Sequence, residues 1–96
     1  MEFNIFYEMG HSWLEAKLSQ MFDMGLADRI TTQSRIKGKR VFLDVDFDAR
    51  EYLKILRKKY PKTKFSIKKI DHSLNRISEM ERYSRESAKR KLELFL

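Results

Sequence analysis

The chain has 96 residues, no cysteine, 42% hydrophobic and 36% charged residues, and a formal net charge of +7. This length supports a single domain over residues 1–96, and the composition is that of a folded protein rather than a disordered one. The lack of cysteine excludes a disulfide framework and a thiolate metal site. No apolar run reaches the roughly 20 residues that cross a bilayer, and the amino end lacks the basic start of a signal peptide. We therefore expect a cytoplasmic protein that does not bind membranes.

Positive charge is concentrated in the middle of the chain. Residues 1–28 contain one basic and five acidic side chains, residues 29–69 contain fourteen and four, and residues 70–96 contain six and five. Evenly mixed charge would serve solubility equally well, so this asymmetry favours a surface that faces a polyanion.

The first part of the chain predicts a strand and then a helix. Apolar residues alternate over residues 3–7, as in a short strand. Ser12, with Glu15 three residues later, has the spacing of a capping box. An apolar stripe at helical spacing follows and comprises Leu14, Leu18, Met21 and Phe22. We therefore expect a helix that starts at Ser12 and ends at Gly25.

Residues 30–47 are predicted to form a β-hairpin that turns at Gly38 and Lys39. Glycine at the first of two turn positions is typical of a type II′ turn. In this register Ile36 faces Val41 and one side of the hairpin is apolar. The other predicted pairs on that side are Ser34 with Leu43, Thr32 with Val45, and Ile30 with Phe47.

An amphipathic helix is predicted after the hairpin. Asp48, with Glu51 three residues later, indicates its start, and Pro61 ends it because the residue before a proline is pushed out of the α region. Its core side carries Ala49, Tyr52, Leu53, Leu56 and Tyr60. Its opposite side is cationic and carries Arg50, Lys54, Arg57 and Lys58. Alternation over residues 64–70 then predicts another strand.

The last segment predicts a long helix over residues 73–96, which either packs on the sheet or projects from the domain. Its apolar stripe runs through Leu74, Ile77 and Met80, becomes sparse over residues 81–91, and returns at the carboxyl end. An apolar end left exposed is a liability, so it is a candidate contact with a protein partner or, in a homodimer, with a second copy of the chain. The residues of this candidate contact are Leu92, Leu94, Phe95 and Leu96.

The predicted elements follow the order strand, helix, strand, strand, helix, strand, with one further helix. This is the order of a ferredoxin-like split βαβ unit. We therefore expect an α+β fold in which a small sheet contains the hairpin and has its helices packed on one face.

Two cationic groups predict a function. The hairpin group is Arg35, Lys37, Lys39 and Arg40, and the helix group is Arg50, Lys54, Arg57 and Lys58. Lys37 and Arg40 would face each other across the hairpin, and a phosphate would relieve their repulsion. The prediction is non-catalytic, salt-dependent binding of RNA or DNA. Phe42, on the same strand face as Arg35, is a candidate for stacking on a base, and packing beneath the last helix is its alternative role.

Two other functions stay open. One is a protein-interaction module, such as an inhibitor or an accessory subunit that docks on a larger protein. The other is a nuclease in which Asp44 and Asp46 share a Mg²⁺ ion. His11 and His72 are interpreted as turn residues, and the chain has no glycine-rich phosphate loop or nucleophile elbow. We therefore expect a protein without enzyme activity, cofactor or resident metal.

Overall fold

The computed structural model describes residues 1–8, 10–71 and 76–94 and shows an α+β fold. The strands within these residues are β1 (Glu2–Glu8), β2 (His11–Lys17), β3 (Arg35–Lys37), β4 (Arg40–Asp44), β5 (Ser66–Asp71) and β6 (Glu81–Arg82). The helices are α1 (Leu18–Asp23), α2 (Asp48–Lys59) and α3 (Arg85–Leu94), and a short 3-10 helix, η2, spans Ile77–Glu79.

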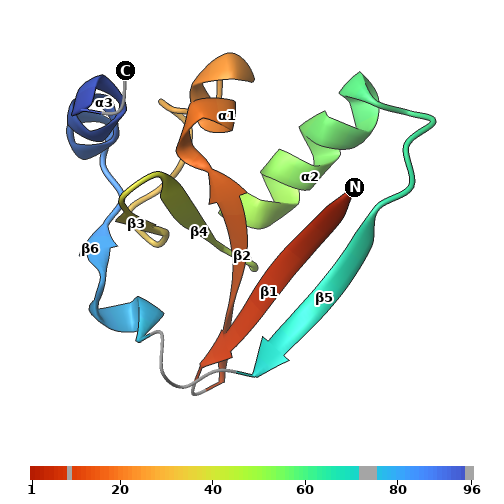
Figure 1. Ribbon diagram of the computed structural model, residues 1–96, viewed down its shortest axis with the longest axis horizontal. Helices are drawn as coiled ribbons and strands as arrows, with labels where there is room; N and C mark the ends of the chain where they lie inside the picture. Colours follow the sequence, from red (N-terminus) through yellow and green to blue (C-terminus); the bar gives the residue numbers. More distant parts are fainter. Residues whose placement is uncertain (9, 72–75, 95–96) are drawn as a thin grey trace.

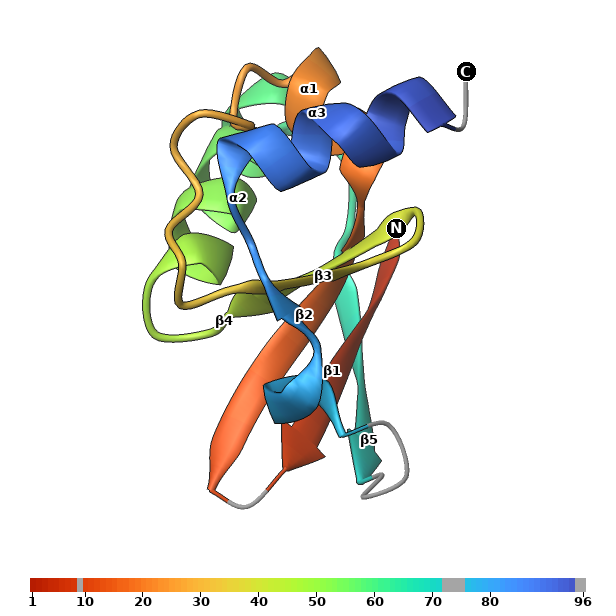
Figure 2. The ribbon, with the colours of Figure 1, turned by 90° about the vertical axis from the view of Figure 1, so that its left-hand side faces the viewer.

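The six strands form one mixed sheet in the order β5-β1-β2-β4-β3-β6 (Figure 1). The β1–β5 pair is parallel and the other neighbours are antiparallel. Figure 2 shows η2, β6 and α3 on the side of the molecule that faces the viewer. The predicted α+β class is confirmed. The strand order differs from the expected ferredoxin-like one, because β2 forms where the first helix was predicted and β1 lies between β2 and β5.

The segment His11–Lys17 is a strand, so the helix predicted from Ser12 is wrong in its first half. The sequence fits both patterns here, since Leu14 and Leu18 have the four-residue spacing of a helix while Leu14 and Ala16 have the two-residue spacing of a strand. The strand forms because β1 and β4 pair with it on its two sides. Trp13 and Leu14 are then buried on opposite faces of the sheet. His11 is consequently a strand residue and not a turn residue.

Helix α1 ends as predicted at Gly25, whose φ of 69° is in the left-handed region that favours glycine. The Gly25 N–H donates to the Phe22 carbonyl at 3.0 Å, and the Leu26 N–H donates to the Met21 carbonyl at 2.8 Å. These two bonds form a Schellman motif, which satisfies carbonyls that the helix end leaves without partners.

The hairpin forms in the predicted register. Ile36 pairs with Val41 and Lys37 with Arg40. Gly38 has a φ of 58° and Lys39 is not among the described residues with positive φ, which identifies the predicted type II′ turn. The hairpin is shorter than residues 30–47, because β3 starts at Arg35 and β4 ends at Asp44.

Helix α2 forms where it was predicted and buries Ala49, Tyr52 and Leu56. The core position predicted for Tyr60 is wrong, because this residue follows the end of the helix and is 41% exposed. Asp48 begins the helix as predicted, but its side chain makes no capping hydrogen bond. Its carboxylate accepts hydrogen bonds from the Thr31 N–H, the Thr31 hydroxyl and the Ser34 hydroxyl at 3.0, 2.8 and 2.6 Å. Asp48 thus ties the loop before β3 to the start of α2.

The sheet has a separate core on each face. Buried side chains of the first core, which α1 and α2 cover, include Leu14, Met21, Ile36, Val41, Leu43, Tyr52 and Leu56. The second is a smaller aromatic core under η2 and consists of Phe6, Trp13, Phe42 and Ile77, with Ile70 and Met80 packed against it.

The long helix predicted over residues 73–96 is wrong, because only Arg85–Leu94 of that segment is described as α-helix. Ile77 packs in the aromatic core, β6 pairs with β3, and the Tyr83 hydroxyl donates to the Ala27 carbonyl at 2.6 Å. These contacts hold the chain against the sheet. Leu74 and His72 lie outside the described residues. None of the described helices has the length and apolar character needed to span a membrane.

Candidate functional site

Three cations stand side by side on three neighbouring strands. Arg40 of β4 is opposite Lys37 of β3 on one side and opposite Lys17 of β2 on the other. Residues directly opposite in a sheet project from the same face, so Lys17, Lys37 and Arg40 form a line that we call the hairpin row. All three are exposed, and none is in an ion pair with a described residue. Lys39 is exposed at the turn, and its carbonyl accepts from the Leu18 N–H at 2.9 Å.

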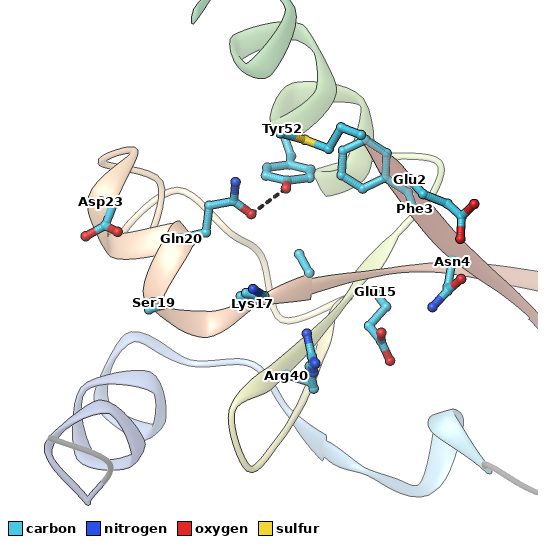
Figure 3. A pocket seen from close by; sticks show the side chains of 12 residues that line it. Glu2, Phe3, Asn4, Glu15, Lys17, Ser19, Gln20, Asp23, Arg40 and Tyr52 are labelled. Atoms are coloured by element: carbon cyan, nitrogen blue, oxygen red, sulfur yellow. Dashed lines mark hydrogen bonds between the residues drawn. The ribbon is translucent and has the colours of Figure 1, made fainter. Parts of the chain in front are cut away.

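Beside the hairpin row, β1 and β2 separate and leave a cleft of about 540 Å³. Their pairing ends at Ile5 and Leu14, so Asn4 and Glu15 lie on opposite sides of the cleft. Figure 3 shows Lys17, Glu15 and Arg40 along one side, with Glu2 and Asn4 along the other. Three carboxylates line this cleft, those of Glu2, Glu15 and Asp23. The cleft therefore offers mixed charge rather than a dedicated anion site.

Tyr52 lies at the back of the same cleft. Its hydroxyl donates to Gln20 Oε1 at 2.7 Å, which joins α2 to α1 (Figure 3). Burial raises the pKa of Tyr52 to about 12. The phenol is therefore protonated at neutral pH and acts as a donor that fixes the two helices.

Arg35 belongs to the predicted hairpin group, but it is partly withdrawn from the surface. Its guanidinium carbon lies 5.5 Å from the centroid of the Trp13 ring, and its Nη1 donates to the Thr32 carbonyl at 3.4 Å. Burial, and then the nearby charge of Arg82 on β6, lower the pKa of Arg35. Arg35 is thus held by the aromatic core, apart from the exposed row.

The predicted base-stacking role of Phe42 is wrong. Its side chain is only 6% exposed and packs in the aromatic core, with its ring centroid 5.8 Å from that of Phe6. The alternative prediction was packing beneath the last helix. The structure instead places Ile77 of η2 in the same core, because the chain after residue 75 folds back across this face.

The second cationic group extends beyond the predicted helix face. Seven exposed cations over residues 50–64, none in an ion pair with a described residue, form what we call the α2 surface. They are Arg50, Lys54, Arg57, Lys58, Lys59, Lys62 and Lys64. Glu51 is the single acidic residue of this stretch, and Arg29 contacts it at 2.7 Å. The prediction included only the four cations opposite the apolar side of the helix and so missed Lys59, Lys62 and Lys64, although the absence of acids after Glu51 already marked the whole stretch.

The hairpin row and the α2 surface lie on opposite sides of the sheet. Helix α2 packs on the face that carries Val41 and Leu43. Arg40 precedes Val41 on the strand and therefore projects from the other face. The structure does not bring the two predicted cationic groups into one surface.

The predicted magnesium pair does not form in the described chain. Asp44 is 1% exposed, with Oδ2 lying 2.8 Å from His11 Nε2 and Oδ1 accepting from the Asp46 N–H at 2.8 Å. Asp46 itself is exposed. No group of three or more His, Cys, Asp or Glu among the described residues could hold a metal ion.

The residues of the predicted contact at the carboxyl end differ in their exposure. Leu92 is half-buried and packs against the first core, whereas Leu94 is 79% exposed. Phe95 and Leu96 lie outside the described residues. Leu92 thus has an intramolecular role.

Comparison with protein-family models, with curated proteins and with solved structures gives no match.

Proposed function

We propose that the protein binds nucleic acid without catalysis, through phosphate contacts centred on the α2 surface. The supporting observation is seven exposed cations in residues 50–64, where the single acid already has a partner. Such a concentration of one charge opposes folding by self-repulsion. A nucleic acid relieves the repulsion, and each phosphate that is neutralised releases counterions.

Helix α2 presents part of this charge in a line. Arg50, Lys54 and Lys58 are four residues apart, so successive cations are separated by about 6 Å along the helix axis. The buried Tyr52 and Leu56 hold the opposite side of the helix on the sheet. Phosphate contacts of this kind position a nucleic acid but carry little sequence information. We therefore expect the protein to show only modest selectivity among nucleic-acid sequences.

The hairpin row is the secondary contact of this proposal. It faces the other side of the sheet and borders a cleft that contains three carboxylates. Its contribution is therefore smaller than that of the α2 surface.

Fluorescence anisotropy with short single- and double-stranded RNA and DNA at two salt concentrations tests the proposal. We expect submicromolar affinity that falls steeply with salt. On a duplex, log K should fall by about 0.9 per phosphate contact for each tenfold rise in salt concentration. Weak binding to every form of nucleic acid, with a salt dependence that corresponds to only one or two phosphate contacts, would contradict the proposed function. Heparin, a polyanion without bases, is the control that distinguishes binding of nucleic acid from binding of any polyanion.

A further inference from the structure

Strand β5 forms an edge of the sheet, and its outer side has no neighbour in the part of the chain that is described (Figure 1). It pairs with β1 along its whole length. The Ser66 N–H donates inward to the Met1 carbonyl at 2.9 Å. Because inward and outward backbone groups alternate along a strand, the N–H groups of Ile67 and Lys69 point away from β1. The outward donors of this edge therefore include these two N–H groups.

The side chains of this edge oppose pairing between two copies of the chain. Lys68 and Lys69 are both exposed, and an antiparallel pair of β5 strands would bring lysines close to lysines. Lysine on an edge strand is a usual protection against such self-association. A second copy is thus the least suitable occupant.

Charge and shape together define a suitable occupant. No acidic side chain occurs from Tyr52 to Ile70, so the connection into β5 and most of the strand carry only cations. The acidic residues next to this stretch are Asp71, which ends β5, and Glu2, which lies opposite Ser66 on β1. Ile67 is 49% exposed and projects from the same face as Tyr7 of β1, which is 50% exposed. An extended segment with acidic residues near the lysines and an apolar residue over Ile67 would complement both features.

We infer that β5 accepts an acidic, extended segment of a protein partner as a seventh strand of the sheet. Backbone groups of Ile67 and Lys69 supply the hydrogen bonds, and Lys68 and Lys69 select acidic partners over other strands. The inference goes beyond the nucleic-acid proposal, because it requires the outer backbone of β5 rather than the α2 surface.

The probe is a peptide of alternating glutamate and valine, titrated into the full chain while NMR follows the amides of β5. We expect saturable binding, with slowed hydrogen exchange at Ile67 and Lys69. Ile67→Pro removes an outward N–H and leaves the net charge unchanged, and Ile67→Thr is the matched control that keeps this N–H. The proline variant should bind about tenfold more weakly than the threonine variant, the effect expected for one or two lost hydrogen bonds.

A second measurement needs no substitution. An N-methylated copy of the peptide keeps the charge but lacks strand donors, and it should also bind about tenfold more weakly to the unmodified protein. Equal binding of the two peptides, or of the two variants, would reduce the contact to charge alone and overturn the inference. The absence of saturable peptide binding would overturn it too. So would a DNA duplex that protects these amides when the peptide does not.

Discussion

The hairpin row and the α2 surface carry charge of the same sign but are built differently. Strand pairing holds Lys17, Arg40 and Lys37 about 5 Å apart from strand to strand. On α2 and the connection after it, the cations project from a helix surface and from exposed loop positions. The first arrangement depends on the local hairpin and on the long-range pairing of β2 with β4, whereas the second depends on local sequence.

The surroundings of the two regions differ more than their geometry. The hairpin row shares its cleft with the carboxylates of Glu2, Glu15 and Asp23. Within residues 50–64 the single acidic residue is Glu51, and Arg29 contacts it. What matters for binding a polyanion is therefore the number of cations without a nearby carboxylate. By this measure the α2 surface is a better candidate than the hairpin row.

The largest expected effect comes from removing the packing beneath the α2 surface. Leu56→Ala deletes a fully buried side chain and should lower the free energy of unfolding by about 3 kcal/mol, because a cavity remains. Chemical denaturation measures this loss. The control Lys54→Ala, on the exposed side of α2, should change stability by less than about 0.5 kcal/mol. A similar effect of the two variants would contradict the packing described for α2.

The next effect is on binding. Reversing charge with Lys54→Glu, Arg57→Glu and Lys58→Glu should weaken nucleic-acid binding about a hundredfold, since three phosphate contacts are lost and repulsion replaces them. Fluorescence anisotropy gives the affinity and circular dichroism shows whether the fold is kept. Unchanged affinity in a folded variant would exclude α2 from the interface.

The hairpin row provides the matched variant with the same change of net charge. Lys17→Glu, Lys37→Glu and Arg40→Glu together should weaken binding only about tenfold, as expected for a secondary contact. The same anisotropy measurement applies. A loss greater than that of the α2 variant would reverse the order of the two regions.

The smallest effect concerns Tyr52, which lies on the buried side of α2 and lines the cleft. Tyr52→Phe removes the hydrogen bond to Gln20 and should cost about 1 kcal/mol at neutral pH. Burial raises the pKa of Tyr52 to about 12, above the ordinary value of about 10. The stability linked to this shift is present below about pH 10 and is lost as the pH rises toward about 12.

Urea denaturation across this alkaline range tests that assignment. The variant should lose less stability than the natural chain. Tyr83, whose pKa burial also raises to about 12, should preserve part of the alkaline loss in both proteins. Identical pH dependence of the two proteins would show that Tyr52 ionisation is not linked to unfolding.

The regions that sequence predicted well are those whose contacts are local. Gly38 determines the turn, and the pairing of Ile36 with Val41 then follows from alternation. Pro61 and the apolar stripe of α2 likewise act within one segment. The positions of Arg50, Lys54, Arg57 and Lys58 on an exposed face followed from the same pattern.

The regions predicted wrongly depend on distant partners. Residues 12–17 match a helix and a strand equally well, and the choice is made by β1 and β4. Lys17 could not be placed beside Arg40 before that pairing was known. After residue 75 the chain follows η2 and β6 because Ile77 finds an aromatic core on the sheet, a contact that periodicity within the segment does not show.

The parallel pairing of β1 with β5 has a consequence for how the protein folds. Glu2 pairs with Ser66, sixty-four residues later in the chain. Contacts this distant in sequence are slow to form because a long loop must close first. During synthesis, β1 can pair with β2, and β2 with β4, before β5 emerges, so the side of β1 that faces β5 is the later of its two sides to receive a neighbour. We therefore expect the completion of the sheet at β1 to be a late step of folding, and until then one edge of β1 is open to pairing with another chain.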